Sequence, residues 1–154
     1  MKKLEEIKQD LERKAAGVQI TLEGNSLFIP KERWFQVAKI LKEDPDYSFD
    51  YLSSVTGVDY KEYLEAVYHF YSIEKKEGPL AVKVRTDMEK SVIPSVTPLW
   101  RSAEFQEREA YDLFGIHFEG HPDLRRILMW DEFEFHPMRK SYVPENQDRP
   151  PEEF

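Results

Sequence analysis

Apolar residues recur at helical spacing in two segments near the start of the chain. Residues 4–15 carry one apolar stripe between charged positions, at Leu4, Ile7, Leu11 and Ala15. Residues 31–44 repeat the pattern, at Trp34, Val37, Ala38 and Leu41. A spacing of three and four residues aligns side chains on one face of an α-helix. The pattern predicts two amphipathic helices, which end before Gly17 and Pro45.

Alternating apolar and polar residues predict β-strands between these helices and after them. Residues 18–30 alternate around a Gly24-Asn25 turn, which predicts two short strands, and Pro30 ends the second. Three longer β-rich segments follow, at residues 47–60, 62–73 and 80–86. Their short connections favour antiparallel pairing. The middle segment is apolar on both faces, so we place it at the centre of the sheet and expect its His69 to be packed and hydrogen-bonded.

A third helical segment is expected before Gly115, a residue type that commonly follows a helix end. Thr97-Pro98 is a suitable N-cap and first-turn pair, whereas Ser102 could cap a second helix after a break, so one helix and two both stay open. The expected buried stripe is Leu99, Ala103, Ala110 and Phe114. Two to three helices packed on a mostly antiparallel sheet of about four to five strands make an α+β fold.

From residue 119 onwards the composition changes. This last part is 36 residues long and holds five of the ten prolines: Pro122, Pro137, Pro144, Pro150 and Pro151. Large apolar residues are spread between the prolines, and a merely disordered tail would be poor in them. We therefore divide the chain into an α+β domain, residues 1–118, and a C-terminal arm, residues 119–154, that lies extended along a partner. The alternative, that the arm wraps back over its own domain, stays open for its first half.

Charge and composition exclude several classes of function. The chain has 22 basic and 30 acidic residues, a net charge of -8, which repels phosphate backbones and makes nucleic acid an improbable partner. It has no cysteine, which excludes disulfides, thiolate nucleophiles and the usual iron–sulfur ligands. No apolar run approaches the roughly 20 residues that cross a bilayer. We expect a folded protein that is soluble or peripheral to a membrane.

The stretch EREAYDLFGIHFEGHPDLRRIL, residues 107–128, gathers the candidate site residues: Glu107, Arg108, Glu109, Asp112, His121, Arg125 and Arg126. Paired acids can divide acid and base roles when their environments separate their pKa values. Here the nearby arginines favour ionised carboxylates, and no glycine-rich phosphate loop, Ser/His/Asp set or dinucleotide fingerprint accompanies them. We expect a structural ion-pair network, in which Arg108 pairs with Glu104 and Asp112, four residues away, and the cluster includes the two adjacent arginines.

His117 and His121 have a four-residue spacing that zinc sites use on a helix. Gly115 ends the helix before them, and Gly120 and Pro122 flank the second histidine, so the two imidazoles need not share a face. The nearest further histidine is the distant His136. We therefore expect no metal on this chain.

The same stretch resembles the signature of the C-type subunit of NADH-quinone oxidoreductase, the family of the 30 kDa subunit of mitochondrial complex I. Residues 107–114 match its Glu-Arg-Glu, two residues, an acid and two apolar residues, and the matches continue at His121, Arg125, Ile127 and Leu128. HPMRKSYVP, residues 136–144, is similar to the family's His/Trp-Pro-Leu-Arg-Lys-Asp-Tyr-Pro, with Met138 and Ser141 as departures. TGVDY at 56–60 and PSVTPLWRSAEFQERE also fit, so the resemblance covers most of residues 48–144.

The resemblance implies a non-catalytic peripheral-arm subunit of a proton-translocating complex, one that binds no cofactor and has no catalytic residue. It would scaffold the quinone-reducing module by binding the D-type subunit of that complex, with the B-type subunit nearby, while FMN, iron–sulfur clusters and quinone belong to other subunits. The chain would be a peripheral protein of the inner cell membrane, and in a prokaryote it would lie on the cytoplasmic side. The alternatives are the equivalent subunit of a plastoquinone-, F420- or hydrogenase-linked relative, a solitary binding module, or a free-standing enzyme. The expected contacts of the arm with the D-type subunit are Trp130, Phe133, Phe135, Arg139, Lys140 and Tyr142.

Overall fold

The computed structural model describes residues 1–144, so the last ten residues of the arm, with Pro150 and Pro151, lie outside the described residues. Residues 1–144 contain three helices: α1 (Leu4–Lys14), α2 (Lys31–Glu43) and α3 (Ala103–Phe114). Seven strands accompany them: β1 (Thr21–Glu23), β2 (Ser26–Phe28), β3 (Tyr51–Asp59), β4 (Tyr63–Ser72), β5 (Glu77–Asp87), β6 (Val92–Pro94) and β7 (His117–Glu119). The predicted α+β class is confirmed.

The main sheet has five strands in the order β1-β2-β5-β4-β3. Its pairs are antiparallel except β2 and β5, which run parallel, with Leu27 opposite Val82. The strand β4 has a neighbour on each side, as its apolar faces predicted, although the middle position belongs to β5. His69 of β4 is partly buried and shares a hydrogen bond of 3.0 Å with the Ser54 hydroxyl, so its expected structural role fits the fold.

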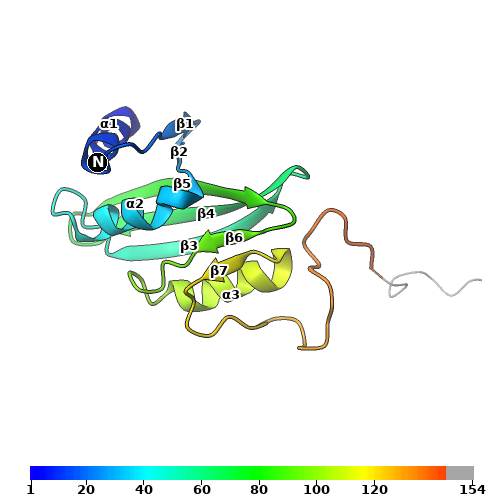
Figure 1. Cartoon of the computed structure of the whole chain (residues 1–154). Coiled ribbons are helices and arrows are strands. Elements are labelled where there is room, and N and C mark those ends of the chain that lie inside the picture. Colours follow the sequence, from blue (N-terminus) through cyan, green and yellow to red (C-terminus); the bar gives the residue numbers. More distant parts are fainter. Residues whose placement is uncertain (145–154) are drawn as a thin grey trace, which may run out of the picture.

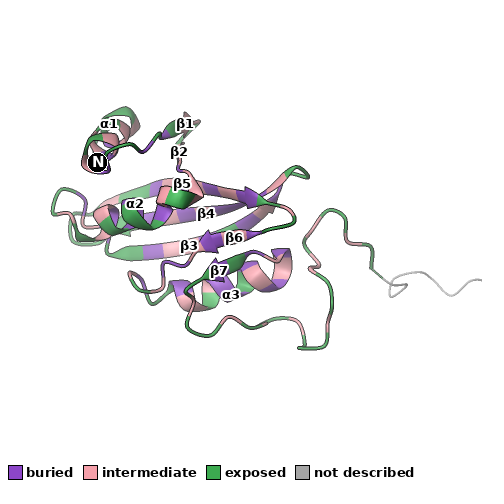
Figure 2. Ribbon diagram, in the orientation of Figure 1, coloured by how far each residue is buried: buried purple, intermediate pink, exposed green. Residues whose placement is uncertain are grey.

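One face of the sheet packs against helices. Trp34 of α2 lies 4.8 Å from Tyr68 and 6.1 Å from Phe70, measured between ring centroids, and Trp100 before α3 lies 4.8 Å from Phe70. All four rings are buried. Figure 1 shows α2 across the sheet and α3 below it, and Figure 2 shows the buried positions concentrated between them. The core of the domain is therefore the layer between the sheet and these helices.

The third helix begins at Ala103, directly after Ser102, so a single helix from Thr97 is wrong and the break that the sequence left open before Ala103 is confirmed. The carbonyl of Val96 accepts hydrogen bonds from the N–H groups of Leu99 and Trp100, which makes a turn before the helix. Ser102 directly precedes the helix, but its hydroxyl donates to the Leu52 carbonyl at 3.1 Å instead of capping. Tertiary packing on the sheet, which the local sequence does not show, replaces the expected first turn.

A second, two-stranded sheet brackets α3 and was not predicted. The strands β6 and β7 lie parallel, with Ile93 opposite Phe118. Each has three residues, and unlike β1 and β2 they are not joined by a recognisable turn, because α3 lies between them in the sequence. Gly115 ends α3 in the left-handed conformation, at a φ of 78°, and so turns the chain from the helix into β7.

The described part of the C-terminal arm, residues 119–144, packs on its own domain, the alternative that the sequence left open for its first half. The Met138 N–H donates to the Leu113 carbonyl at 3.0 Å, at the end of α3. The Lys140 N–H donates to the Asp59 carboxylate at 2.8 Å, at the end of β3. Figure 1 shows this segment, in orange, following a curved course beside α3. Regular helices and strands are absent from residues 120–144.

We expect the contact between β3 and α3 to be sensitive to one methyl group. A Cβ at Gly57 would lie 2.3 Å from the Phe114 ring, far inside van der Waals contact. Gly57→Ala should therefore lower the free energy of unfolding by about 1–3 kcal/mol, as overpacked cores do. Urea denaturation measures the change, and Phe114→Leu in the Gly57→Ala background should recover part of it. Equal stability of Gly57→Ala and the unchanged chain would contradict this packing.

Candidate functional site

Asp112, in the last turn of α3, holds the beginning of the arm with a single side chain. Its carboxylate is fully buried. One oxygen, Oδ2, accepts hydrogen bonds from the consecutive N–H groups of Ile127, Leu128 and Met129 at 3.1, 2.7 and 2.8 Å. The other, Oδ1, accepts from Arg126 Nη1 at 2.7 Å. Asp112 therefore anchors residues 126–129 to the end of α3.

The environment of Asp112 keeps its carboxylate ionised. Burial raises the pKa of Asp112. The hydrogen bonds from the Arg126 guanidinium and from the three N–H groups of residues 127–129, of which Met129 contributes most, outweigh burial and hold that pKa below its usual range. Arg126 also donates to the Asp112 carbonyl at 3.2 Å and to the Phe135 carbonyl at 2.9 Å. A carboxylate with this many donors is suited to holding the chain and unsuited to proton transfer near neutral pH.

Arg108 joins the cluster through main-chain oxygens instead of carboxylates. Its Nε donates to the Arg125 carbonyl at 3.1 Å, and its Nη2 donates to the Arg126 carbonyl at 2.9 Å. Among the ion pairs of the described residues, none joins it to Glu104 or Asp112, so this part of the expected network is wrong. The guanidinium is directed to the arm because its five donors can satisfy carbonyls that the irregular segment leaves without partners.

Glu107 lies on another side of α3 and has no cationic partner within residues 1–144. Its carboxylate is fully buried and accepts hydrogen bonds from the Ser95 hydroxyl at 2.6 Å and the Val96 N–H at 2.8 Å. Burial raises the pKa of Glu107 to about 7, although both hydrogen bonds act in the opposite direction. The expected pairing with the arginines therefore does not include Glu107. This residue ties α3 to the segment after β6.

Two of the predicted residues, Glu109 and Arg125, lie outside the buried part of the network. Glu109 is exposed and takes part in none of the ion pairs found within residues 1–144. Arg125 pairs with Asp123 at 2.9 Å, and both of these side chains are largely exposed. An exposed pair of this kind contributes little to stability. The predicted network thus reduces to the buried pair of Asp112 and Arg126, with Arg108 bound to the backbone of the arm.

The two histidines have different surroundings. The Nε2 atom of His121 lies 2.8 Å from the Glu104 carbonyl oxygen, and its Nδ1 accepts from the Asp123 N–H at 3.0 Å. Both ring nitrogens are thus used inside the chain, in a tautomer with the proton on Nε2. His117 lies in β7 with its side chain exposed. This arrangement gives His121 a structural role, and the lack of a metal site stays a prediction.

The predicted aromatic contacts of the arm lie together. The ring centroids of Trp130 and Phe133 are 4.7 Å apart, and Phe133 lies 5.8 Å from Phe135 and 6.1 Å from Tyr142. Sequence spacing did not predict this cluster. Arg139 faces its own domain, because its Nε donates to the Phe114 carbonyl at 2.6 Å. The Lys140 side chain is exposed.

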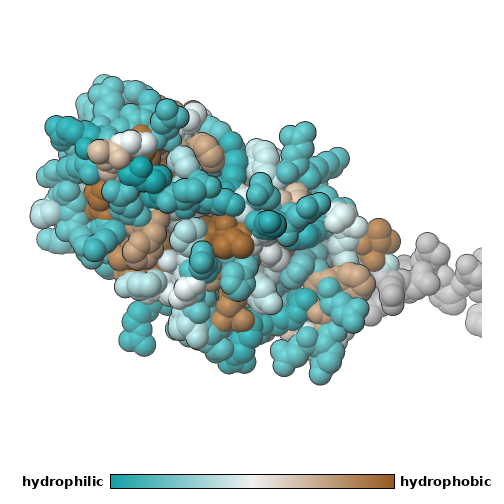
Figure 3. Space-filling model, in the orientation of Figure 1, coloured by the Kyte–Doolittle hydropathy of each residue, from teal (hydrophilic) through white to brown (hydrophobic). Residues whose placement is uncertain are grey.

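The arm also presents apolar side chains to solvent. Its exposed members, which we call the arm apolar surface, are Ile127, Leu128, Trp130, Phe135, Met138 and Val143. Figure 3 shows hydrophobic side chains beside the start of the grey segment. Ile127, Leu128, Met138 and Val143 were not among the predicted contacts. Their apolar character was visible in the sequence, but which side of an irregular segment faces outward was not.

Comparison with known proteins identifies related chains. Residues 27–148 match the family model described as respiratory-chain NADH dehydrogenase, 30 kDa subunit. The chain is 47% identical over 117 residues to the second C-type subunit of NADH-quinone oxidoreductase of Rhizobium meliloti, covering 74% of this chain and 63% of that protein. It spans less than two thirds of the length of the Rhizobium meliloti relative and of the Chloroherpeton thalassium relative.

Two solved structures have a similar fold. A trypsin-resistant fragment of Nqo5 superposes with a TM-score of 0.60 at 36% identity, covering 80% of this chain and 100% of that chain. A chain of the membrane-bound sulfane sulfur reductase, an archaeal respiratory membrane complex, superposes with a TM-score of 0.69 at 26% identity, covering 92% and 86%. In the described part of this chain, every helix is too short or too polar to cross a bilayer.

The two adjacent arginines should differ sharply in their contribution to stability. Arg126→Met leaves the buried Asp112 carboxylate without its cation and should cost about 3–5 kcal/mol of unfolding free energy. Arg125→Met removes only an exposed pair and should cost less than about 1 kcal/mol. Urea denaturation of both variants measures the difference. Equal effects would show that the buried pair does not hold the arm.

Glu107 should make stability depend on pH. Its pKa is raised from 4.5 unfolded to about 7 folded, so the folded state holds this proton more tightly. Stability from this group is full below pH 4.5 and is lost as pH rises through about 7, by roughly 3 kcal/mol. Glu107→Gln should remove this loss when unfolding is measured in urea at pH 5 and pH 8. The exposed Glu109→Gln is the control, and an unchanged pH profile in Glu107→Gln would contradict the assignment.

Proposed function

This chain belongs to the family of the 30 kDa subunit of respiratory-chain NADH dehydrogenase, and we propose that it is a non-catalytic peripheral-arm subunit of a proton-translocating NADH-quinone oxidoreductase. In this proposal it scaffolds the quinone-reducing module by binding the D-type subunit, with the B-type subunit as a further neighbour. The name of the Rhizobium meliloti relative supports the assignment to this complex. FMN, iron–sulfur clusters and quinone then belong to other subunits, and the chain meets the inner membrane on its cytoplasmic side through them.

The observation that carries the proposal is the arm apolar surface. It lies on a segment whose backbone is hydrogen-bonded to the α+β domain. Leu128 and Met138 are 58% and 56% exposed, while their backbone N–H groups are bound to Asp112 and Leu113. Six exposed large apolar side chains on one short segment are a common mark of a binding site. Since the hydrogen bonds already fix the shape of the segment, little conformational entropy is lost when a partner covers it.

The chemistry of the acidic residues supports a non-catalytic role. Asp112 is held ionised by Met129, Arg126 and neighbouring N–H groups, and its oxygens are occupied by these donors. Glu107 has a raised pKa, but its carboxylate is fully buried behind Ser95 and Val96, out of reach of a substrate. Both acids are used inside the fold, and a general acid or base must reach its substrate.

A second candidate is the equivalent subunit of a relative of complex I with another electron donor or acceptor. The fold shared with a chain of the archaeal sulfane sulfur reductase complex favours keeping this candidate. Both candidates use the same docking role for the arm. They differ in the subunits that accompany the chain, which mass spectrometry of the complex purified from mildly solubilised host membranes identifies.

Charged substitutions on the arm apolar surface test the docking role. Leu128→Glu with Met138→Glu changes two exposed side chains, so the chain should fold with a nearly unchanged Tm. In a host carrying this variant, we expect the D-type subunit to be purified without the chain, because two buried carboxylates would face an apolar partner. Subunit stoichiometry in the purified complex is the measurement.

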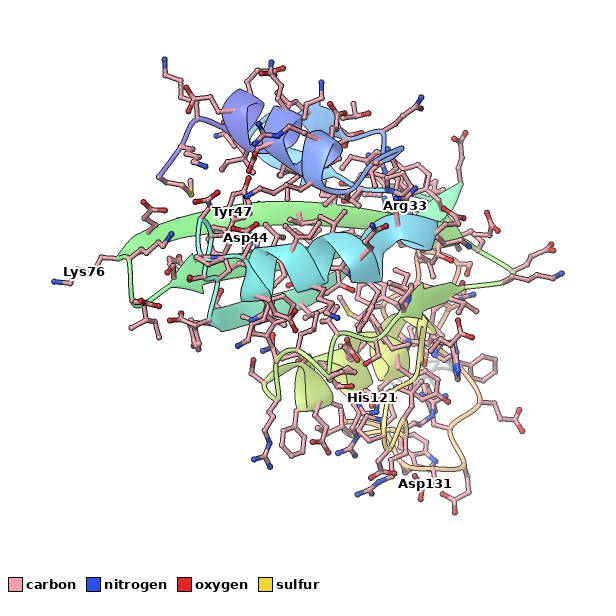
Figure 4. All side chains as sticks on the ribbon, turned by 60° about the vertical axis from the view of Figure 1, so that its left-hand side comes forward. Arg33, Asp44, Tyr47, Lys76, His121 and Asp131 are labelled. Carbon is pink, nitrogen blue, oxygen red and sulfur yellow. The ribbon has the colours of Figure 1, made fainter. Side chains whose placement is uncertain are left out.

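The matched control is Ile73→Glu, an exposed apolar residue (66%) after β4. It lies near the hairpin that carries Lys76, and Figure 4 shows Lys76 and the arm residue Asp131 at opposite ends of the molecule. The control variant should enter the complex in normal amount. Normal assembly of the Leu128 and Met138 double variant, or equal loss of the control, would place the interface elsewhere on the domain.

A further inference from the structure

The aromatic side chains of the arm surround a hollow at its outer end. The hollow has a volume of about 330 Å³, and we call it the aromatic hollow; its lining residues are Trp130, Glu132, Phe133, Glu134, Phe135, Tyr142, Val143 and Pro144. The ring centroids of Phe135 and Tyr142 are 5.9 Å apart, and those of Trp130 and Phe133 are 4.7 Å apart. Four rings of different orientation thus border one small space.

Acidic residues alternate with these rings along the chain. The segment reads Trp130-Asp131-Glu132-Phe133-Glu134-Phe135, and its three carboxylates are exposed. Within residues 1–144, none of the three is part of an ion pair. Arg126, which lies beside Phe133, is committed to Asp112 and to the Phe135 carbonyl. Within residues 1–144, the carboxylates of Glu132 and Glu134 at the border of the aromatic hollow are therefore not held in an ion pair.

Rings and carboxylates together select a cation. The faces of aromatic rings carry negative partial charge and attract Lys and Arg side chains, most strongly for Trp, and the attraction grows when water is excluded. A purely apolar partner would cover Glu132 and Glu134 without compensating their charge, which is unfavourable. A second copy of this chain is disfavoured as well, because each copy carries a net charge of -8.

We propose that the aromatic hollow binds one cationic side chain, an arginine or a lysine, from a basic segment of the partner that the arm contacts. The proposal rests on the proposed docking function and adds the chemistry of the partner to it. The side chain enters the aromatic hollow against the ring faces that line it, and Glu132 and Glu134 pair with its charge and with further basic residues beside it. Within the chain, the Arg126 guanidinium carbon already lies 5.5 Å from the Phe133 ring centroid.

The test uses the complete complex and separates charge from apolar area. Trp130→Leu keeps an apolar side chain but removes the ring face, and Trp130→Phe restores a ring. Glu132→Gln with Glu134→Gln keeps the shape and removes two charges. The matched controls are Phe35→Leu, an exposed ring on α2, and Glu74→Gln with Glu89→Gln, two exposed acids elsewhere on the domain. Circular dichroism and Tm check that each variant folds.

The affinity of each full-length variant is measured against complex purified from a host that lacks the chain, at several sodium chloride concentrations. We expect Trp130→Leu to bind about tenfold more weakly and Trp130→Phe to recover most of the affinity. The variant with both Glu132→Gln and Glu134→Gln should bind more weakly at low salt and depend less on salt than the unchanged chain. The controls should bind normally.

Other results would contradict either the cation proposal or the docking function, and the variants distinguish between the two. If Trp130→Leu and the glutamine variant bind normally while Leu128→Glu with Met138→Glu still fails to assemble, the cation proposal is wrong and the docking function stands. If Trp130→Leu weakens binding but the loss of both glutamate charges has no effect at any salt concentration, the hollow takes an apolar group. If all of these variants assemble normally, both the docking function and the proposal on its partner are wrong.

Discussion

The position of the arm depends on one buried carboxylate. Asp112 lies in the last turn of α3, where the helix dipole is negative and an anion is unfavourable. Arg126 and the three consecutive N–H groups of residues 127–129 supply the positive charge that compensates both burial and the dipole. The same contacts bend the chain across the end of the helix. The requirement to satisfy this anion therefore determines where the apolar residues that follow are displayed.

The second buried acid of α3 shows the opposite solution. Glu107 is five residues before Asp112 and so lies on a different side of the helix, where it meets Ser95 and Val96. With two neutral donors and no cation among the described residues, burial prevails and its pKa is raised, whereas that of Asp112 is lowered. Two carboxylates on one helix thus serve two contacts: Glu107 faces the β6 segment and Asp112 faces the arm.

Periodic patterns predicted the elements that bury many side chains, including α1, α2 and the strands β3 to β5. The strands β6 and β7 were missed because they are short and pair across the intervening helix α3, without the turn that marked the equally short β1 and β2. The cluster was predicted by charge sign alone, which identified the region but not its pairs. Arg108 binds two main-chain carbonyls. Because every residue has such a carbonyl, the sequence does not show which of them accepts the hydrogen bonds. The pair of Asp112 and Arg126 spans a helix end whose geometry only the fold defines.

The arm reverses the usual arrangement of a surface segment. Several of its polar groups face inward: the N–H groups of Met138 and Lys140 and the Arg139 guanidinium are bound to the ends of α3 and β3. The side chains of the arm apolar surface are exposed instead of packed on the domain. Such a segment gains little from the hydrophobic effect in the isolated chain, so hydrogen bonds must hold its shape. Covering the outward side by a partner supplies the missing apolar burial, and a segment already fixed by hydrogen bonds can gain it without refolding.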